Sequence, residues 1–283
     1  MFVFESSDLT TEAQPEEAFF KRAWTFFALT LAWTCAFWLG AALTGLGADT
    51  LPGLLLLSLG GMSPALAAVY LTLRESDRSR RRDFWLRIVD TRRIQPVWYL
   101  VIFLTAPLIS LLAIATRAVL TGEPYSFEHA LSLSGQPQSL LLLVLAVFFF
   151  GPLPEEPGWR GFALERLQSR WSGVVSSLVL AAVWAIWHIP LFFIPGTYQQ
   201  YLGFGTPGFW LFMAALFPET VLMTWIFNNT RHSTLSAVLY HFMLNFTGQF
   251  MDPAQGFAGY RLFWTAVMAV GVILISGKDL GKD

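Results

Sequence analysis

The sequence predicts an all-α, polytopic membrane protein with about eight transmembrane helices. Of its 283 residues 55% are hydrophobic and only 13% are charged, whereas a soluble domain usually carries about 25% charged residues. Apolar runs near the length needed to cross a bilayer, about 20 residues, recur along the chain. Each run is expected to be a helix, because backbone polar groups in lipid need partners within their own segment. This composition excludes a disordered chain and argues against a soluble enzyme.

The expected spans cover residues 24–46, 51–73, 97–115, 139–154, 174–194, 209–227, 233–250 and 262–275. Gly60, Gly61 and Pro64 interrupt the second of them. We expect one transmembrane domain over 24–276, between a cytoplasmic segment over 1–23 and a short tail over 277–283. The acidic first residues have no positive region ahead of a short apolar run, so no cleaved signal peptide is expected.

Positive charge predicts the orientation of the spans, because cytoplasmic loops are rich in Lys and Arg. Eight arginines fall between the second and third spans, in segment 74–93. With that segment inside, both termini are cytoplasmic and only Arg117 and Arg261 of the 18 Lys and Arg residues face the other side. We interpret the arginines as a topology anchor near anionic lipid. We expect an integral protein of the cell membrane, and the net charge of −1 indicates no nucleic-acid partner.

Charged side chains at bilayer depth cost about 2.5–3.5 kcal/mol each on insertion scales, so they need a reason. Glu155, Glu156 and Arg160 follow the fourth span. If the helix continues past Pro157, Glu156 and Arg160 are four residues apart and can pair. Glu155 then points about 100° away from Glu156 and is free for chemistry. The alternative is that these charges lie at the membrane surface and are solvated.

Two further polar pairs lie in apolar helices. Trp184 and His188 share one helix face, as do His241 and Asn245. Imidazole suits acid–base work near neutral pH, and an Asn amide can donate to an oxyanion. The alternative for each residue is a packed side chain with an interhelical hydrogen bond.

The depth of these residues suggests that they meet. Glu155 and His188 each lie about 22 Å along their helices from the turn near 169–173, and His241 lies about 15 Å from Arg231. A carboxylate, two imidazoles and an amide are therefore expected in one layer of the bilayer. Polar residues with unrelated structural roles would not be expected to lie at the same depth.

Three motifs in this order, Glu155-Glu156-x-x-x-Arg160, Trp184-x-x-x-His188 and His241-x-x-x-Asn245, resemble those of the CPBP (ABI) family of intramembrane proteases. The family includes type II CAAX prenyl endopeptidases and bacteriocin-processing or self-immunity proteins. The similar region, about 139–250, is the expected catalytic core. Two departures stand out: Trp184 replaces the usual Phe, and Pro157 with Gly158 puts the regularity of the first helix in doubt.

The resemblance implies proteolysis within or near the cytoplasmic half of the membrane. It implies that Glu155 activates a water with help from His188, and that His241 and Asn245 stabilise the oxyanion. Glu156, Arg160 and Trp184 would support the site. The implied substrate is a membrane-embedded or lipidated peptide, possibly of the CAAX type. Glu219, in the sixth span, is expected either to line the substrate cavity, to pair with a histidine or to be a solvated kink.

The cofactor and the function class stay open at this point. The family has been described both as metal-dependent and as metal-free; no cofactor is expected, but Glu155, His188 and His241 could in principle hold a zinc ion. One alternative is a non-catalytic peptide-binding or bacteriocin self-immunity protein of the same fold. Another is a transporter, against which no inverted repeat is found. Loss of activity in a folded Glu155→Gln variant would favour the protease.

Overall fold

The structure is a computed structural model that describes residues 9–251 and 256–281. This part of the chain contains helices and no strand. The all-α class is therefore confirmed. The expected N-terminal segment lies partly outside the described residues, as does the end of the expected tail. Helix α1 already begins at Leu9, so the part of that segment that is described continues into the first span without a break.

The helices follow one another with short connections. In chain order they are α1 (Leu9–Thr44), α2 (Leu51–Gly61), α3 (Ser63–Leu73), α4 (Arg78–Val89), η1 (Thr91–Arg93), α5 (Pro96–Thr121), α6 (Glu128–Ser134), α7 (Pro137–Phe150), α8 (Pro152–Gly158), η2 (Trp159–Leu164), α9 (Glu165–Gln168), α10 (Gly173–His188), η3 (Ile189–Phe193), α11 (Tyr198–Leu202), α12 (Pro207–Asn229), α13 (Thr234–Phe250) and α14 (Ala258–Ser276).

Within the described residues, six helical segments are long and apolar enough to cross a membrane. The pair α2 and α3, bent by 42°, raises the number to seven if it forms one span. The remaining expected span, 233–250, which is the seventh along the chain, forms α13, whose 17 residues fall short of the usual length of about 20. Helix α13 packs against α5, α8 and α12, so it lies inside the bundle, where a full-length lipid-facing span is not required.

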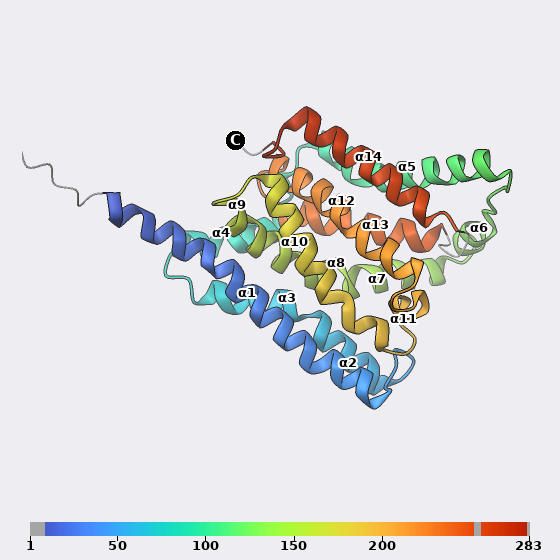
Figure 1. Cartoon of the computed structure of the whole chain (residues 1–283), viewed down its shortest axis with the longest axis horizontal. Helices are drawn as coiled ribbons and strands as arrows, with labels where there is room; N and C mark the ends of the chain where they lie inside the picture. The colour runs from blue at the N-terminus through green and yellow to red at the C-terminus, as the bar shows by residue number, and fades with distance from the viewer. Residues whose placement is uncertain (1–8, 252–255, 282–283) are drawn as a thin grey trace, which may run out of the picture.

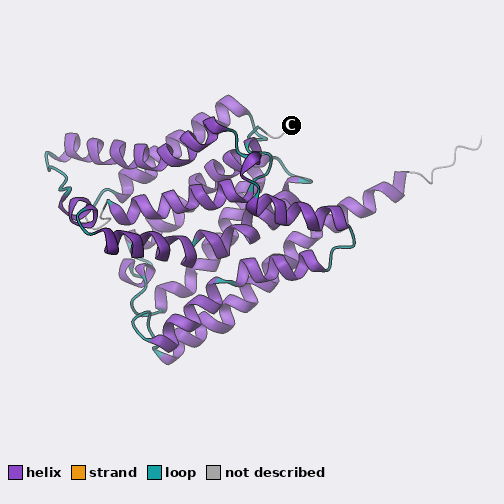
Figure 2. Ribbon diagram, turned by 180° about the vertical axis from the view of Figure 1, so that it is seen from behind, coloured by secondary structure: helices purple, strands orange, loops and turns teal. Residues whose placement is uncertain are grey.

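The helices lie in three groups (Figure 1). Helices α1, α2 and α3 pack together on one side, and α5 and α14 pack together on the opposite side. Between them lie α8, α10, α12 and α13, as the view from behind also shows (Figure 2). Helices α10 and α13 begin at serine caps, Ser172 and Ser233, whose hydroxyl oxygens each accept a backbone N–H at 3.3 Å. These caps fix the start of the two helices that carry the histidines.

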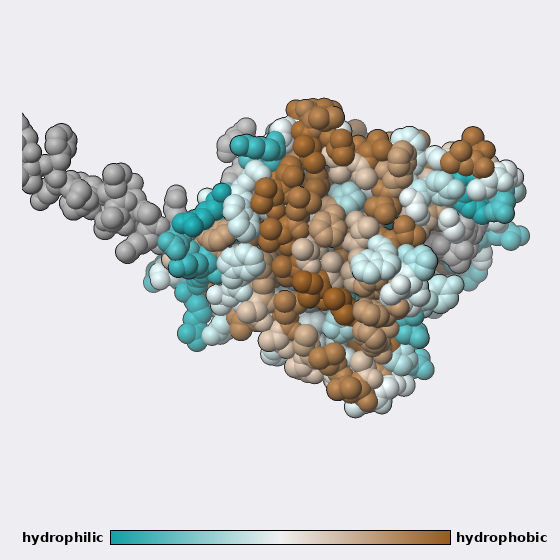
Figure 3. Space-filling view, in the orientation of Figure 1, coloured by the Kyte–Doolittle hydropathy of each residue, from teal (hydrophilic) through white to brown (hydrophobic). Residues whose placement is uncertain are grey.

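The outer surface is apolar in its middle. Four leucines on one face of α5, Leu100, Leu104, Leu108 and Leu111, are exposed. In the space-filling view, apolar side chains cover the middle of the visible face and hydrophilic ones gather towards its two ends (Figure 3). Exposed apolar area on this scale marks contact with lipid, which agrees with an integral, multi-pass membrane protein.

Candidate active site

The helix that carries the first motif is irregular, as its prolines indicated. Helix α7 ends at Phe150, α8 restarts at Pro152, and the chain then widens into the π-helix η2 directly after Pro157 and Gly158. Proline has no N–H to donate to the preceding turn, and π-helical turns occur where the regular hydrogen-bond ladder is interrupted, often at functional sites.

Glu156 and Arg160 form a buried ion pair across this irregular turn. Arg160 Nη1 donates to both carboxylate oxygens of Glu156, at 2.9 and 3.1 Å, and both side chains are fully buried. Arg160 Nη2 also donates to Thr220 at 3.4 Å, and the guanidinium lies 4.8 Å from the Trp184 ring centre. The pair expected from the four-residue spacing is present, because the helix continues past Pro157.

His241 is the third member of this buried cluster. Its Nδ1 lies 2.8 Å from Oε1 of Glu156. A carboxylate that is already bound by Arg160 accepts hydrogen bonds and does not donate them, so Nδ1 carries the proton. Nε2 is then the nitrogen that is left for a ligand or substrate. The sequence paired His241 only with Asn245 and gave no sign of this contact, which joins residues 85 positions apart.

Glu155 has a different environment from its neighbour Glu156. Its Oε2 accepts a hydrogen bond from the indole Nε1 of Trp184 at 2.9 Å. Within 9–251 and 256–281 its carboxylate accepts no other hydrogen bond and forms no ion pair. Phenylalanine, the usual residue at this place in the family that the motifs resemble, could not donate this bond. Trp184 therefore does more than fill space, and Glu155 keeps one oxygen available.

His188 is oriented by the backbone of its own helix. Its Nδ1 lies 2.8 Å from the carbonyl oxygen of Trp184. Because a carbonyl only accepts, Nδ1 is the donor, and the Nε2 of the neutral ring carries the lone pair. The indole of Trp184 contacts both imidazoles, with ring centres 5.4 Å from His188 and 5.2 Å from His241. Trp184 thus stands between the two histidines and holds both rings.

A cavity of about 680 Å³ brings the expected site residues together. Its lining includes Glu155, His188, His241, Asn245 and Glu219. The remaining wall is mostly apolar and comes from α1, α2, α7 and α10 to α14. This volume is typical of a site for a small molecule or a short peptide segment. This arrangement agrees with the prediction that the carboxylate, the two imidazoles and the amide lie close together.

Asn245 lies in the cavity wall opposite the break at Gly151. A Cβ at position 151 would lie only 3.2 Å from the Asn245 Nδ2. Asn245 is half-buried, and its amide has no hydrogen-bond partner among the described residues. A polar group in such a position is available to a substrate.

Glu219 lines the cavity, and its partner is an arginine where the sequence suggested a histidine. Arg261 Nη2 lies 3.6 Å from Glu219 Oε1 and donates to the carbonyl oxygen of Leu244 at 3.1 Å. Gly248 makes room for this guanidinium, since a Cβ there would lie 2.7 Å from Nη1. From the sequence, no role is predicted for Arg261. The signal that could have identified Arg261 is its predicted location, since only Arg261 and Arg117 are expected on the side of the membrane opposite the arginine-rich segment.

The three possible zinc ligands do not converge as arranged here. Among the described residues, no group of three or more His, Cys, Asp or Glu side chains is placed to hold a metal ion. Glu155, His188 and His241 line one cavity, and in each of them one oxygen or nitrogen is held by a protein hydrogen bond while the other is left free. As placed, the three side chains are not grouped around a common point for a metal ion, so no step is routed through a metal.

Buried contacts hold the helices of the site in place. The indole Nε1 of Trp187 donates to Thr34 of α1 at 2.7 Å and lies 3.2 Å from Ser63 of α3. These bonds tie the end of α10, next to His188, to the other side of the bundle. Helix α8 meets α3 at Gly158, where a Cβ would lie 2.5 Å from the Cβ of Pro64.

Comparison with known proteins agrees with this geometry. Residues 137–247 match the model of the type II CAAX prenyl endopeptidase Rce1-like family. The chain is also 27% identical over 261 residues to "CAAX prenyl protease 2" of Methanococcus maripaludis, covering 88% of this chain and 89% of the relative. The matched region contains all three motifs of the site. The similarity to the CAAX prenyl endopeptidases, which the motifs indicated, is thereby confirmed.

Proposed function

We propose that the protein is an intramembrane endopeptidase in which Glu155 acts as the general base for the attack of water on a peptide bond. The observation that carries the proposal is the contrast between two adjacent carboxylates. Glu156 is bound by Arg160 and His241. Glu155 accepts one hydrogen bond and lines the cavity with two histidines and an amide. One carboxylate is committed to structure and the other is available to take a proton.

The first step removes a proton from water. The free oxygen of Glu155 takes the proton while the water oxygen attacks the scissile carbonyl carbon. His188 presents the Nε2 lone pair and accepts a second hydrogen bond from the same water, which orients it. Trp184 keeps Glu155 and His188 in register, because it donates to the carboxylate and its carbonyl holds the imidazole. General-base catalysis of this kind contributes about 10²–10⁴-fold.

The second step stabilises the oxyanion and then releases the amine. Asn245 donates through Nδ2, and His241 donates through Nε2 when its ring carries both protons. The carboxylate of Glu156 faces Nδ1 of that ring and balances the charge of the imidazolium. The tetrahedral intermediate collapses when Glu155 passes its proton to the leaving nitrogen, which restores the carboxylate.

The substrate class follows from the cavity wall and from the relatives. The wall is mostly apolar and the surrounding helices face lipid, which suits a peptide that is embedded in or anchored to the membrane. The names of the matched family and of the archaeal relative refer to CAAX prenyl substrates. We propose a membrane-associated protein or peptide with a CAAX-type end as substrate.

This mechanism uses only the side chains of the chain. Dialysis of the purified protein against a metal chelator is therefore expected to leave the rate of peptide cleavage unchanged. A loss of activity that is restored by zinc would require the site residues to rearrange around a metal ion, and would replace the role given to Glu155.

We also propose that the arginine-rich end, with α4, faces the cytoplasm. The cavity wall includes Tyr198 and Gln199 of α11, at the other end of the bundle from α4 (Figure 1). In this orientation the end of the cavity that is lined by α11 faces away from the cytoplasm. The family resemblance instead implies proteolysis in or near the cytoplasmic half of the membrane. Labelling of Arg82→Cys and Tyr201→Cys in a Cys35→Ala background, with a membrane-impermeant reagent added to intact cells, decides the matter. Only Tyr201→Cys should react.

The function is tested by comparing peptide termini in membranes that carry the wild type or Glu155→Gln at matched expression. Termini found only with the wild type would establish a Glu155-dependent endopeptidase, and their sequences would name the substrate. Identical termini from two folded proteins would overturn the proposal. A peptide-binding or immunity role would then be the better explanation.

A further inference from the structure

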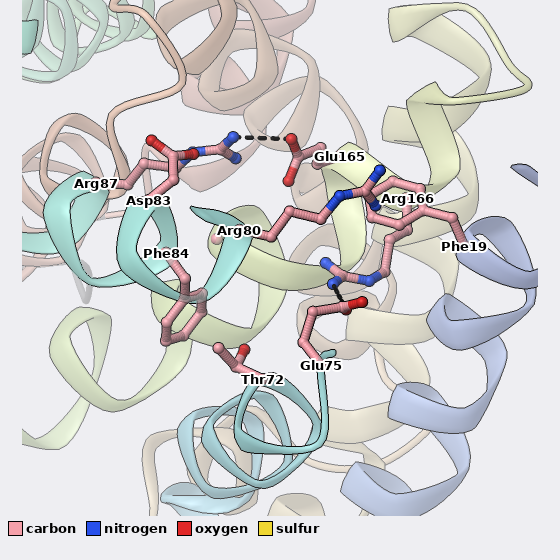
Figure 4. Close-up of a pocket in the computed structure, with 10 residues that line it drawn as sticks. Phe19, Thr72, Glu75, Arg80, Asp83, Phe84, Arg87, Glu165 and Arg166 are labelled. Carbon is pink, nitrogen blue, oxygen red and sulfur yellow. Dashed lines mark hydrogen bonds and ion pairs between the residues drawn. The ribbon is translucent and has the colours of Figure 1, made fainter. Parts of the chain in front are cut away.

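A second cavity, of about 240 Å³, lies at the arginine-rich end of the bundle. It is formed where α4, the end of α3 and the start of α1 meet η2 and α9 (Figure 4). Its wall consists of Phe19, Thr72, Glu75, Arg80, Asp83, Phe84, Arg87, Gly161, Glu165 and Arg166. Apart from sharing the helical segment that follows Glu155, it has no residue in common with the active-site cavity. The proposed protease mechanism leaves it unexplained.

The carboxylates of this cavity are already neutralised. Glu75 binds Arg22 and lies 3.5 Å from Nη2 of Arg166. Asp83 binds Arg93 and lies 2.5 Å from Nε of Arg87. Glu165 lies 2.8 Å from Nη2 of Arg87. With Arg80 and its partner Asp77 included, five arginines face four carboxylates, which leaves a surplus of one positive charge at the cavity.

Two of the arginines have donors to spare. The carboxylate nearest to Arg80 is the exposed Asp77, outside the cavity wall, at 3.5 Å. Arg166 is buried, with only 5% of its surface exposed. Its Nε has no hydrogen-bond partner among the described residues. Both guanidinium groups lie over the ring of Phe19, at 4.5 and 4.6 Å. Figure 4 shows the two side chains reaching the same part of the cavity beside that ring.

We propose that this cavity binds a phosphate group, with an anionic lipid headgroup as its source. Guanidinium groups present several N–H donors in a planar fork that matches phosphate geometry. Basic pockets between helices at the membrane surface are suited to lipid headgroups. The flanking aromatic residues Trp24, Tyr70 and Trp85 are exposed, as expected at the lipid–water interface. The arginine-rich segment is then a specific site in addition to a topology anchor.

The test measures binding and does not depend on proteolysis. Purified full-length protein in a neutral detergent is titrated with dihexanoyl phosphatidic acid, dihexanoyl phosphatidylcholine or inorganic phosphate, and bound molecules are counted by native mass spectrometry. The variant is Arg80→Gln, since Arg80 lines the cavity and its side chain is exposed. The matched control is Arg82→Gln, which removes the same charge from the same helix outside the cavity wall.

The proposal predicts one phosphatidic acid per protein, with binding weakened about tenfold or more by Arg80→Gln and less than about twofold by Arg82→Gln. Equal binding of inorganic phosphate would assign the site to phosphate as such, and binding of phosphatidic acid alone would assign it to the lipid headgroup. Absent binding, equal binding of phosphatidylcholine, or equal losses in the two variants would overturn the proposal.

Discussion

Glu156→Gln is predicted to lower the stability of the protein, because it breaks the buried cluster behind the cavity that Glu155 lines. The substitution keeps the size of the side chain but removes its charge. Arg160, which is fully buried and donates to both oxygens of Glu156, would be left with an uncompensated charge. His241 would lose the carboxylate that faces its Nδ1 at 2.8 Å.

The size of the effect follows from this burial. Removal of one partner from a buried ion pair costs about 3–5 kcal/mol of stability. For a chain of this size, 1 kcal/mol changes Tm by about 2–4 °C. We therefore expect the Tm of the detergent-solubilised protein to fall by about 6–20 °C, as followed by intrinsic fluorescence during heating.

A matched control is available in α1, where Glu17 pairs with Lys21 at the same four-residue spacing but on the surface, at 2.7 Å. Exposed pairs of this kind contribute about 0.3–0.5 kcal/mol, so Glu17→Gln should lower Tm by less than about 2 °C. If Glu156→Gln and Glu17→Gln lower Tm equally, the buried cluster does not stabilise the site and the reasoning fails.

Three further substitutions probe single contacts. Asn245→Leu should lower kcat by about 10²–10³-fold with an unchanged Tm; a folded variant of full activity would remove Asn245 from the oxyanion site. Trp184→Phe removes the N–H donor to Glu155 but keeps an aromatic ring, so the rate of cleavage should fall about tenfold or less. A fall in rate of more than about 100-fold would contradict this modest role of the hydrogen bond. Gly158→Ala should cost about 1–3 kcal/mol by crowding α3, whereas Gly40→Ala, with no atom within 4 Å of the new Cβ, should cost nothing; similar Tm values would contradict the close approach of α8 and α3.

Features that depend on composition or on local spacing could be predicted. The apolar content gave the all-α membrane class, and the four-residue spacing of Glu156 and Arg160 gave the buried pair. Six or seven helical segments of the described residues are long and apolar enough to cross a membrane, close to the expected number of about eight. The difference includes α13, whose 17 residues pack against α5, α8 and α12.

Contacts between distant residues could not be predicted from local patterns. Nothing near Trp184 in the sequence indicates that its indole donates to Glu155, 29 residues earlier. The same holds for His241 with Glu156 and for Arg261 with Glu219. These contacts depend on how α8, α10, α12, α13 and α14 pack. The wide turn at η2 was foreseen only as a doubt about regularity after Pro157.

The most direct test of the central claim uses purified wild type and Glu155→Gln in liposomes with a synthetic prenylated peptide that ends in a CAAX sequence. Mass spectrometry measures the rate at which the C-terminal fragment is released, and the Tm of each protein is measured in parallel. We predict that Glu155→Gln slows release by about 10²–10⁴-fold while Tm stays within about 2 °C, because Gln can still accept the Trp184 N–H. Release at the wild-type rate by folded Glu155→Gln would contradict the role of Glu155 as the general base.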